Sequence, residues 1–181
     1  FANDYNLDGI DVDLEGVLLT NIDNAGNYTP FIAALADALQ PLGKLVTAAT
    51  ASYEGGMVPI SSLPYFDFVN IMTYAGSDHG TMDQFQKGLE YWSGRGLAKE
   101  KIVLGVPFYS EPGGISFAKL TKNDPAAAQA DSFEYIGAVQ NYNGIPTIQA
   151  KTRLAMEKAI GIMFWALDHD TQGDLSLLNA I

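Results

Sequence analysis

The sequence predicts an α/β fold built on a parallel sheet, and two observations lead to this prediction. Five short apolar runs have the length and the β-branched character of buried strands, and helical patterns lie between several of them. Strands that alternate with helices favour βαβ units with right-handed crossovers, so that successive strands run parallel. This pattern is compatible with both an open and a closed sheet.

The expected strands are residues 7–14, 44–51, 66–73, 102–108 and 161–166, and the expected helices are residues 30–40, 82–93 and 147–158. The first helix has Thr29 as a candidate N-cap and Pro30 at its first position, and Pro41 and Gly43 end it. The last helix leads directly into the last strand.

The second helix begins with a capping-box pattern, Thr81 followed three residues later by Gln84. Its apolar residues Phe85, Leu89 and Trp92 share one face. We therefore expect Trp92 to pack in the core rather than to bind a ligand.

Residues 111–142 form a longer and more polar stretch than a plain strand-to-helix connection, and they include Gly113, Gly114 and Pro125. We expect a loop-and-helix excursion at one end of the sheet. Such excursions often form a wall of a binding site.

Length and composition exclude several classes of protein. With 181 residues, the chain is one domain or part of a larger one. Lys and Arg number 10 against 21 Asp and Glu, and this net charge of −11 argues against nucleic-acid and anionic-membrane partners. The chain has no cysteine, which excludes disulfides and thiolate chemistry, and its apolar stretches are too short to span a bilayer. No signal peptide is visible and Phe1 opens almost directly into a strand pattern, so we expect a preceding segment.

Carboxylates are concentrated in the first expected strand, where Asp11, Asp13 and Glu15 alternate with apolar residues. Alternate residues of a strand point to one side, about 6 to 7 Å apart. Like charges at this spacing repel, so at least one of these carboxyls should have a raised pKa and hold a proton, as a general acid requires. A solvated polar face is one alternative reading, and an oxygen-ligand site for Mg²⁺ or Ca²⁺ is another.

At this point the chain resembles a known family. Residues 8–15, DGIDVDLE, resemble the Asp-Gly-x-Asp-x-Asp-x-Glu signature of glycoside hydrolase family 18, the chitinase family. The runs FDFVNIMTY at 66–74, GVPFY at 105–109 and GIMFW at 161–165 resemble its sixth, seventh and eighth barrel strands, in the family's order. The resemblance implies a (β/α)8 TIM-type barrel, present here only as roughly strands 4 to 8.

The resemblance also implies a role for each carboxylate. Glu15 would be the general acid and then the base. Asp13 would orient the substrate's 2-acetamido group and stabilise the oxazolinium ion that forms when this group attacks C1, and Asp11 would hold Asp13. Family 18 is an exception to the two-carboxylate retaining scheme, because the substrate supplies the nucleophile.

Four further residues are implied to bind substrate or assist. Tyr74 resembles the tyrosine whose hydroxyl meets the acetamido carbonyl, with Met72 on the same face. Trp165 would form the floor under the sugar in the −1 subsite, although burial in the barrel core is an alternative for it, as it is for Tyr74. Tyr109, at the end of the seventh-strand run, is expected in the substrate-binding set.

The chain departs from the family pattern after the sixth strand. The family usually has Met-x-Tyr-Asp, whereas this chain has Ala75 after Tyr74, so a carboxylate that would face the acid is absent. Asp78 is a candidate replacement for that carboxylate, and Ser110 stands where the seventh-strand motif often has Gly.

Other polar residues are interpreted as ordinary. His79 and His169 have no second histidine or cysteine at ligand spacing, so each is expected to be a loop residue. The segment 168–173 resembles a calcium loop but lacks the ligands at its fifth and twelfth positions, and we expect a plain loop there. Glu54 could reach a substrate hydroxyl, although a solvated loop carboxylate is the simpler reading.

We expect a retaining glycosidase without cofactor or metal that cleaves β-1,4 bonds next to N-acetylglucosamine, in chitin or chito-oligosaccharides. The alternatives are an endo-β-N-acetylglucosaminidase that acts on N-glycans and a chitinase-like protein that binds without cutting. The resemblance implies a secreted, periplasmic or cell-surface protein. Because a (β/α)8 barrel takes about 250 residues, we expect the chain to be the C-terminal portion of one catalytic barrel and to need the N-terminal part.

Overall fold

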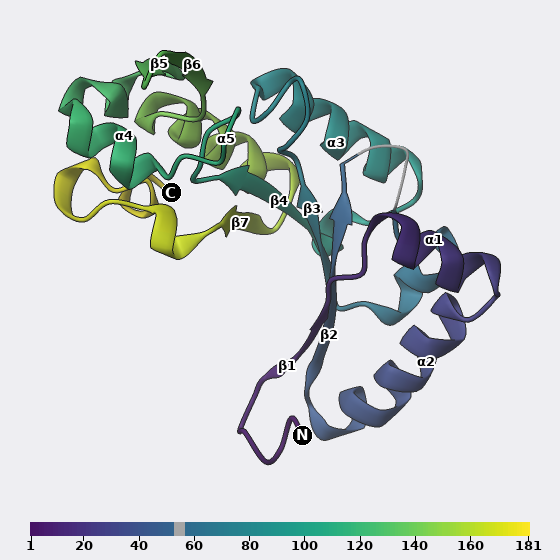
Figure 1. The fold of residues 1–181 in the computed structure, drawn as a ribbon. Coiled ribbons are helices and arrows are strands. Elements are labelled where there is room, and N and C mark those ends of the chain that lie inside the picture. Colours follow the sequence, from purple (N-terminus) through teal and green to yellow (C-terminus); the bar gives the residue numbers. More distant parts are fainter. Residues whose placement is uncertain (53–56) are drawn as a thin grey trace.

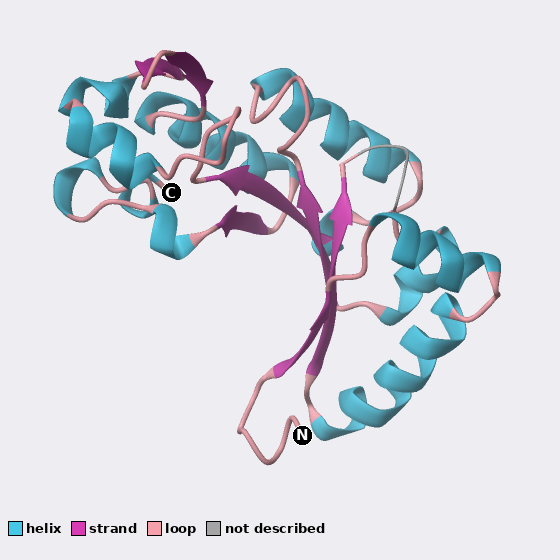
Figure 2. Cartoon of the chain, in the orientation of Figure 1, coloured by secondary structure: helices cyan, strands magenta, loops and turns pink. Residues whose placement is uncertain are grey.

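The computed structural model describes residues 1–52 and 57–181. Its main feature is a five-stranded parallel sheet in the order β1-β2-β3-β4-β7 (Figures 1 and 2). The strands are β1 (Gly9–Val12), β2 (Leu45–Ala51), β3 (Phe68–Met72), β4 (Ile102–Pro107) and β7 (Gly161–Trp165). The α/β class and the parallel sheet are therefore confirmed, and each expected strand is present.

Helices connect the strands and lie along the outer side of the curved sheet (Figure 1). They are α1 (Gly16–Asn24), α2 (Tyr28–Leu39), α3 (Met82–Gly94) and α5 (Ile145–Lys158). None of the helices in the described residues is long and apolar enough to span a bilayer.

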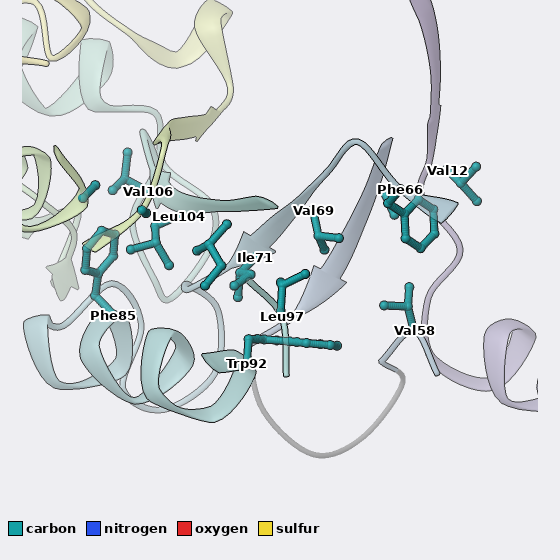
Figure 3. Packing of buried hydrophobic residues seen from close by; sticks show 14 of the residues in the cluster. Val12, Val58, Phe66, Val69, Ile71, Phe85, Trp92, Leu97, Leu104 and Val106 are labelled. Atoms are coloured by element: carbon teal, nitrogen blue, oxygen red, sulfur yellow. The ribbon is translucent and has the colours of Figure 1, made fainter. Parts of the chain in front are cut away.

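The core fills the space between the sheet and these helices (Figure 3). Val69 and Ile71 of β3 and Leu104 of β4 are fully buried and share this core with Phe85 and Trp92 of α3. The Trp92 indole N–H donates to the Ala51 carbonyl at 2.9 Å, which confirms its structural role. Each such apolar side chain contributes about 1.5 to 3 kcal/mol by burial.

Helix α2 begins earlier than the sequence predicts, at Tyr28, with Asn27 in the N-cap position. Pro30 thus lies inside the first turn, where it is tolerated because a first-turn N–H has no partner within the helix. The Thr29 hydroxyl hydrogen-bonds to that of Ser61 at 2.7 Å and does not cap the helix.

Helix α3 begins as predicted, because the Thr81 hydroxyl accepts from the Gln84 N–H at 3.1 Å. The second half of the capping box differs. The Gln84 side-chain oxygen accepts from Gly80 N–H at 2.9 Å, and its amide donates to the Ala75 carbonyl at 2.8 Å. Gln84 therefore links the preceding loop, residues 75–80, to α3 by two side-chain hydrogen bonds.

Strand β1 ends sooner than the sequence predicts, at Val12, and α1 was not predicted at all. Glu15 occupies the N-cap position of α1 with an extended backbone, φ −129° and ψ 163°. The chain remains extended beyond the last ladder pair at Val12, and Asp11, Asp13 and Glu15 line one cavity as the alternation requires.

The excursion of residues 111–142 contains more than the predicted loop and helix. After α4 (Phe117–Asn123) and a 3-10 helix (Pro125–Gln129) comes an antiparallel hairpin of β5 (Ser132–Tyr135) and β6 (Ala138–Asn141). Ile136 and Gly137 form its turn with φ 50° and 75°. A β-branched residue seldom adopts a left-handed conformation, so the sequence carries no standard hairpin signal here.

Within the described residues, β1 pairs only with β2, and β7 pairs only with β4. Both edges of the sheet are therefore free. This matches the expected strands 4 to 8 of a (β/α)8 barrel, with β1 as the fourth and β7 as the eighth.

Candidate active site

An open cavity of about 740 Å³ lies on the inner side of the sheet, toward the carboxyl ends of the strands. Its walls hold most of the residues singled out from the sequence, namely Asp11, Asp13, Glu15, Met72, Tyr74, Tyr109 and Trp165. Carboxyl ends of parallel strands are the usual position of active sites in α/β proteins. The structure thus brings together residues that are up to 154 positions apart, from Asp11 to Trp165.

Glu15 has the electrostatic environment of a proton donor. Partial burial raises the pKa of its carboxyl above the ordinary value, and the negative charge of Asp13 and a hydrogen bond with Asp13 act in the same direction. The expectation that one carboxyl of the group holds its proton more tightly is therefore met, and the group is Glu15.

Asp11 is anchored across the sheet. Its Oδ1 accepts from the Thr47 hydroxyl of β2 and, at 3.2 Å, from the Asn70 side-chain amide of β3. Asp11 and Thr47 are direct partners in the β1–β2 register. These two donors fix the orientation of the Asp11 carboxylate in the cavity wall.

Tyr74 follows β3 and is half-buried beside the carboxylates. Burial raises the pKa of its phenol far above the ordinary value, and Tyr109, Asp13 and Glu15 add to the effect, so the hydroxyl remains protonated and can donate. Among residues 1–52 and 57–181, its one hydrogen-bond partner is the Met163 sulfur at 3.7 Å, a weak acceptor. The hydroxyl is therefore free to donate to a ligand.

Gly105 of β4 makes room for the Tyr74 ring. A Cβ at this position would lie 2.8 Å from Tyr74 Cε1 and 2.8 Å from the Ile71 carbonyl oxygen. Only glycine fits between them.

Aromatic and thioether side chains complete the wall. Tyr109, after β4, meets Tyr74 edge to face with ring centroids 6.2 Å apart. Trp165, at the end of β7, is 57% exposed and lines the cavity, so within this chain it is not packed in the core. Met72 is half-buried in the same wall.

Ala75 also lines this cavity, whereas Asp78 does not. Asp78 lies in a neighbouring depression of about 770 Å³ with Glu111 and Asp131. The structure therefore does not bring Asp78 beside Glu15, and the position next to Tyr74 holds no carboxylate.

The prediction for His79 was incomplete. His79 is in a loop, as expected, but it is only 4% exposed and hydrogen-bonds through both ring nitrogens, to Ala75 N–H at 2.9 Å and to the Tyr109 carbonyl at 3.0 Å. His169 is half-buried with its ring edge-on to Tyr109 at 6.0 Å.

The segment that resembles a calcium loop is a turn organised by Asp170. Its carboxylate accepts hydrogen bonds from the hydroxyl of Ser176 and from the backbone N–H groups of Thr171, Leu177 and Leu178.

The interpretation of Glu54 is not tested, because this residue lies outside the described residues. Among residues 1–52 and 57–181, no group of three or more His, Asp or Glu side chains is placed to hold a metal ion.

Sequence reasoning missed Thr47, Asn70 and Gly105 as site residues. Asn70 had a detectable signal, because it is a polar residue in an apolar strand and lies two positions before Met72, on the same face. Thr47 had none, since its role depends on the β1–β2 register.

A family model described as Glycosyl hydrolases family 18 matches residues 1–170. An endochitinase of Brugia malayi is 25% identical over 252 residues, an alignment that includes 100% of this chain and 50% of the relative. A chitinase-like mite allergen of Dermatophagoides farinae, Der f 18.0101, is 30% identical over 115 residues, covering 59% of this chain and 25% of the allergen.

Solved structures agree with the fold. The GH18 chitinase ChiB from the chitin utilization locus of Flavobacterium johnsoniae is 34% identical, with a TM-score of 0.89 over 100% of this chain and 61% of that one. The Group IV chitinase of Ostrinia furnacalis in complex with allosamidin has a TM-score of 0.77 at 20% identity, over 99% and 68% of the two chains. The chain therefore spans about half the length of the curated endochitinase and 61% of the ChiB chain.

Proposed function

Because the chain belongs to glycosyl hydrolase family 18, we propose that its acidic cavity hydrolyses β-1,4 bonds next to N-acetylglucosamine in chitin or chito-oligosaccharides. The observation that carries this proposal is the environment of Glu15, whose carboxyl has a raised pKa in a cavity shared with Asp13, Tyr74 and Trp165. The names of the relatives support a chitin-type substrate over an N-glycan.

In the proposed reaction, Glu15 gives its proton to the glycosidic oxygen while the acetamido carbonyl oxygen of the −1 sugar attacks C1. The C1–O bond breaks, the leaving sugar departs as an alcohol, and an oxazolinium ion remains. The Glu15 carboxylate then takes a proton from a water molecule. The oxygen of this water attacks C1, which opens the oxazolinium ring and restores the acetamido group. Two inversions at C1 retain the anomeric configuration.

Asp13 would face the acetamido nitrogen and balance the positive charge of the oxazolinium ion. The Tyr74 hydroxyl would donate to the acetamido oxygen, for which its protonated state and weak present partner suit it. Trp165 would stack against the C–H face of the sugar, since more than half of its surface is accessible.

We also propose that the chain works with further barrel strands and that the protein is secreted, periplasmic or held at the cell surface. The free edges of β1 and β7 support the first part, because an unpaired strand edge tends to pair with another strand. Large apolar side chains near β1 are exposed as well, among them Val17 at 76% and Leu18 at 57%.

The test is Glu15→Gln in the protein expressed from its complete coding sequence, with Glu134→Gln on the exposed hairpin as the matched control. The amide keeps the shape of the side chain but cannot deliver a proton, so hydrolysis of chito-oligosaccharides should fall by about 10² to 10⁴ with binding preserved. An N-acetylglucosamine thiazoline should inhibit the parent enzyme. Full activity of Glu15→Gln would refute the assignment. If the parent protein hydrolyses a glycoprotein but no chito-oligosaccharide, the N-glycan enzyme is favoured. If the parent protein binds chito-oligosaccharides without hydrolysing them, it is a lectin.

The need for further strands is tested separately. Residues 1–181 alone are compared with the product of the complete coding sequence by gel filtration, thermal unfolding and turnover. A monomeric, cooperatively unfolding and fully active 181-residue chain would contradict this part.

A further inference from the structure

The loop that follows β3 carries Tyr74 and Ala75 into the cavity, and it is fastened by several buried groups. Gln84 of α3 holds its two ends, Ala75 and Gly80. The Gly80 carbonyl accepts from Lys151 Nζ of α5 at 2.6 Å and from the Asn143 amide at 2.7 Å. These contacts connect the loop to the helices behind it.

His79 connects this loop sideways, to the segment that follows the neighbouring strand β4. Its Nδ1 accepts from the Ala75 backbone N–H at 2.9 Å, and its Nε2 lies 3.0 Å from the Tyr109 carbonyl oxygen. Its ring also packs on the Tyr109 ring, with centroids 4.9 Å apart. His79 therefore joins the segment of Tyr74 to the segment of Tyr109, the two tyrosines that face Glu15.

The partners of His79 determine its protonation state. A backbone N–H only donates, so Nδ1 must carry a lone pair, and a carbonyl oxygen only accepts, so Nε2 must carry the hydrogen. The neutral Nε2–H tautomer is the one form that makes both hydrogen bonds. The doubly protonated ring would place N–H against N–H at Ala75.

Charged groups from three segments of the chain act on His79. Asp78 belongs to its own loop, Glu111 follows β4, and Lys151 comes from α5. Burial is the strongest influence and lowers the pKa of His79, Lys151 acts in the same direction, and the Tyr109 carbonyl, Glu111 and Asp78 oppose it. Lys151 is itself buried, and burial lowers its pKa to about 7.

We propose that His79 is a positioning residue, which in its neutral Nε2–H form sets the distance between Tyr74 and Tyr109 at the cavity and releases them when it is protonated. This inference rests on the proposed function for its effect on catalysis, but not for its effect on structure. It predicts that low pH both destabilises the loop after β3 and displaces Tyr74, the residue that would hydrogen-bond to the acetamido oxygen.

The sign of the pH effect follows from linkage. A histidine whose pKa is lowered on folding contributes stability that is fully present above its unfolded pKa. That contribution is lost as the pH falls from the ordinary value of 6.5 to the lower folded value. Activity that depends on the loop should fall on the acid side as well.

Two substitutions separate the two hydrogen bonds. In His79→Asn the side-chain oxygen lies near the former Nδ1 and can accept from Ala75 N–H at any pH. In His79→Gln the terminal amide lies near the former Nε2 and can donate to Tyr109, but the Ala75 N–H loses its acceptor. His169→Asn is the matched control, because it removes the other imidazole, which also touches Tyr109.

The experiment uses the product of the complete coding sequence. Thermal unfolding and turnover are measured from about pH 4 to about pH 8, a range that includes the ordinary histidine pKa of roughly 6.5. We expect His79→Asn to lose the part of the pH dependence of stability that comes from His79 and to extend the acid limb of the rate profile to lower pH, with a lower turnover at neutral pH because its bond to Tyr109 is lost. His79→Gln should lower turnover at all pH values by up to about 10²-fold, since small misplacements cost that much. His169→Asn should keep the acid limb of the parent.

Nuclear magnetic resonance of ¹⁵N-histidine provides a readout that does not depend on hydrolysis. The His79 signals, assigned by their loss in His79→Asn, should show the Nε2–H tautomer at neutral pH. An Nδ1–H or doubly protonated ring, or an unchanged acid limb of stability in His79→Asn, would overturn the proposal. If the parent protein does not hydrolyse chito-oligosaccharides, the proposed function fails, and the tautomer and the stability profile still decide the role of His79.

Discussion

Replacement of Ala75 by Asp is the most informative single change, because it restores the charge that this chain lacks next to Tyr74. Ala75 is exposed, lines the cavity with Glu15 and has a left-handed backbone, φ 71°. Asp and Asn adopt this conformation more readily than Ala. The hydrogen bonds of Ala75 to His79 and Gln84 use its backbone alone, so they survive the substitution.

The size of the effect follows from Coulomb's law. Ala75 and Glu15 line the same cavity; for an assumed charge separation of about 8 Å across it, two unit charges interact by about 2 kcal/mol at an effective dielectric constant of about 20. Both side chains are partly open to solvent, and screening at physiological salt reduces the interaction to about half. Since one pKa unit corresponds to about 1.4 kcal/mol, the pKa of Glu15 should rise by about one further unit.

The measurement is the pH profile of kcat/KM on a chromogenic N-acetylglucosamine oligomer. A general acid with a higher pKa keeps its proton to higher pH, so the basic limb should move up by about one unit in Ala75→Asp. The shift should shrink in about 1 M salt, where the screening length falls to about 3 Å. Ala75→Asn is the matched control, because it has the same shape and backbone preference without the charge.

Two outcomes would refute the reasoning. If Ala75→Asn moves the profile as much as Ala75→Asp, the effect is steric and not electrostatic. If Ala75→Asp leaves the basic limb unmoved at low salt, either position 75 lies away from the reacting sugar or Glu15 is not the acid that the limb reports.

Three further changes test other parts of the site and the fold. Tyr74→Phe should lower kcat/KM by about 10- to 10²-fold, the value of one hydrogen bond to a charged group, without altering the circular dichroism spectrum. Trp165→Ala should weaken binding of a chito-oligosaccharide by about fivefold in calorimetry, for a loss of about 1 kcal/mol of stacking; equal affinity would place the sugar elsewhere. Gly88→Ala should lower the free energy of unfolding in urea by about 1 to 3 kcal/mol, because its Cβ would lie 2.5 Å from Thr73 Cγ2, whereas Gly94→Ala, with nothing within 4 Å, should not.

The strands could be predicted from their short, β-branched apolar runs, and their parallel direction followed from their alternation with helices. The order of the strands was implied by the family resemblance. Helix α1 could not be predicted, since its first turn, with the exposed Val17 and Leu18, resembles a continuation of the apolar strand. The hairpin at Ile136 was missed for a similar reason, because its turn residue contradicts the usual preference.

The carboxylates of the site were predictable from their alternation at the end of a strand, and its aromatic residues were implied by the family resemblance. The residues that hold them were not predictable. Asn70 and Thr47 orient Asp11 through register, and His79 acts through hydrogen bonds to backbone atoms that no sequence pattern encodes. Asp78 shows the opposite error, since a position three residues from Ala75 in the chain lies in another depression.

The free side of β1 has a consequence for how the chemistry would be switched on. Glu15 follows that edge strand, and burial is the largest cause of its raised pKa. A strand that pairs with β1 would remove more water from Glu15 and strengthen the carboxyl's hold on its proton. Pairing of a further strand with β1 would then both complete the cavity wall and raise the pKa of Glu15. In a loosely assembled or locally opened protein, Glu15 would lose its proton at a lower pH and could not protonate the leaving group.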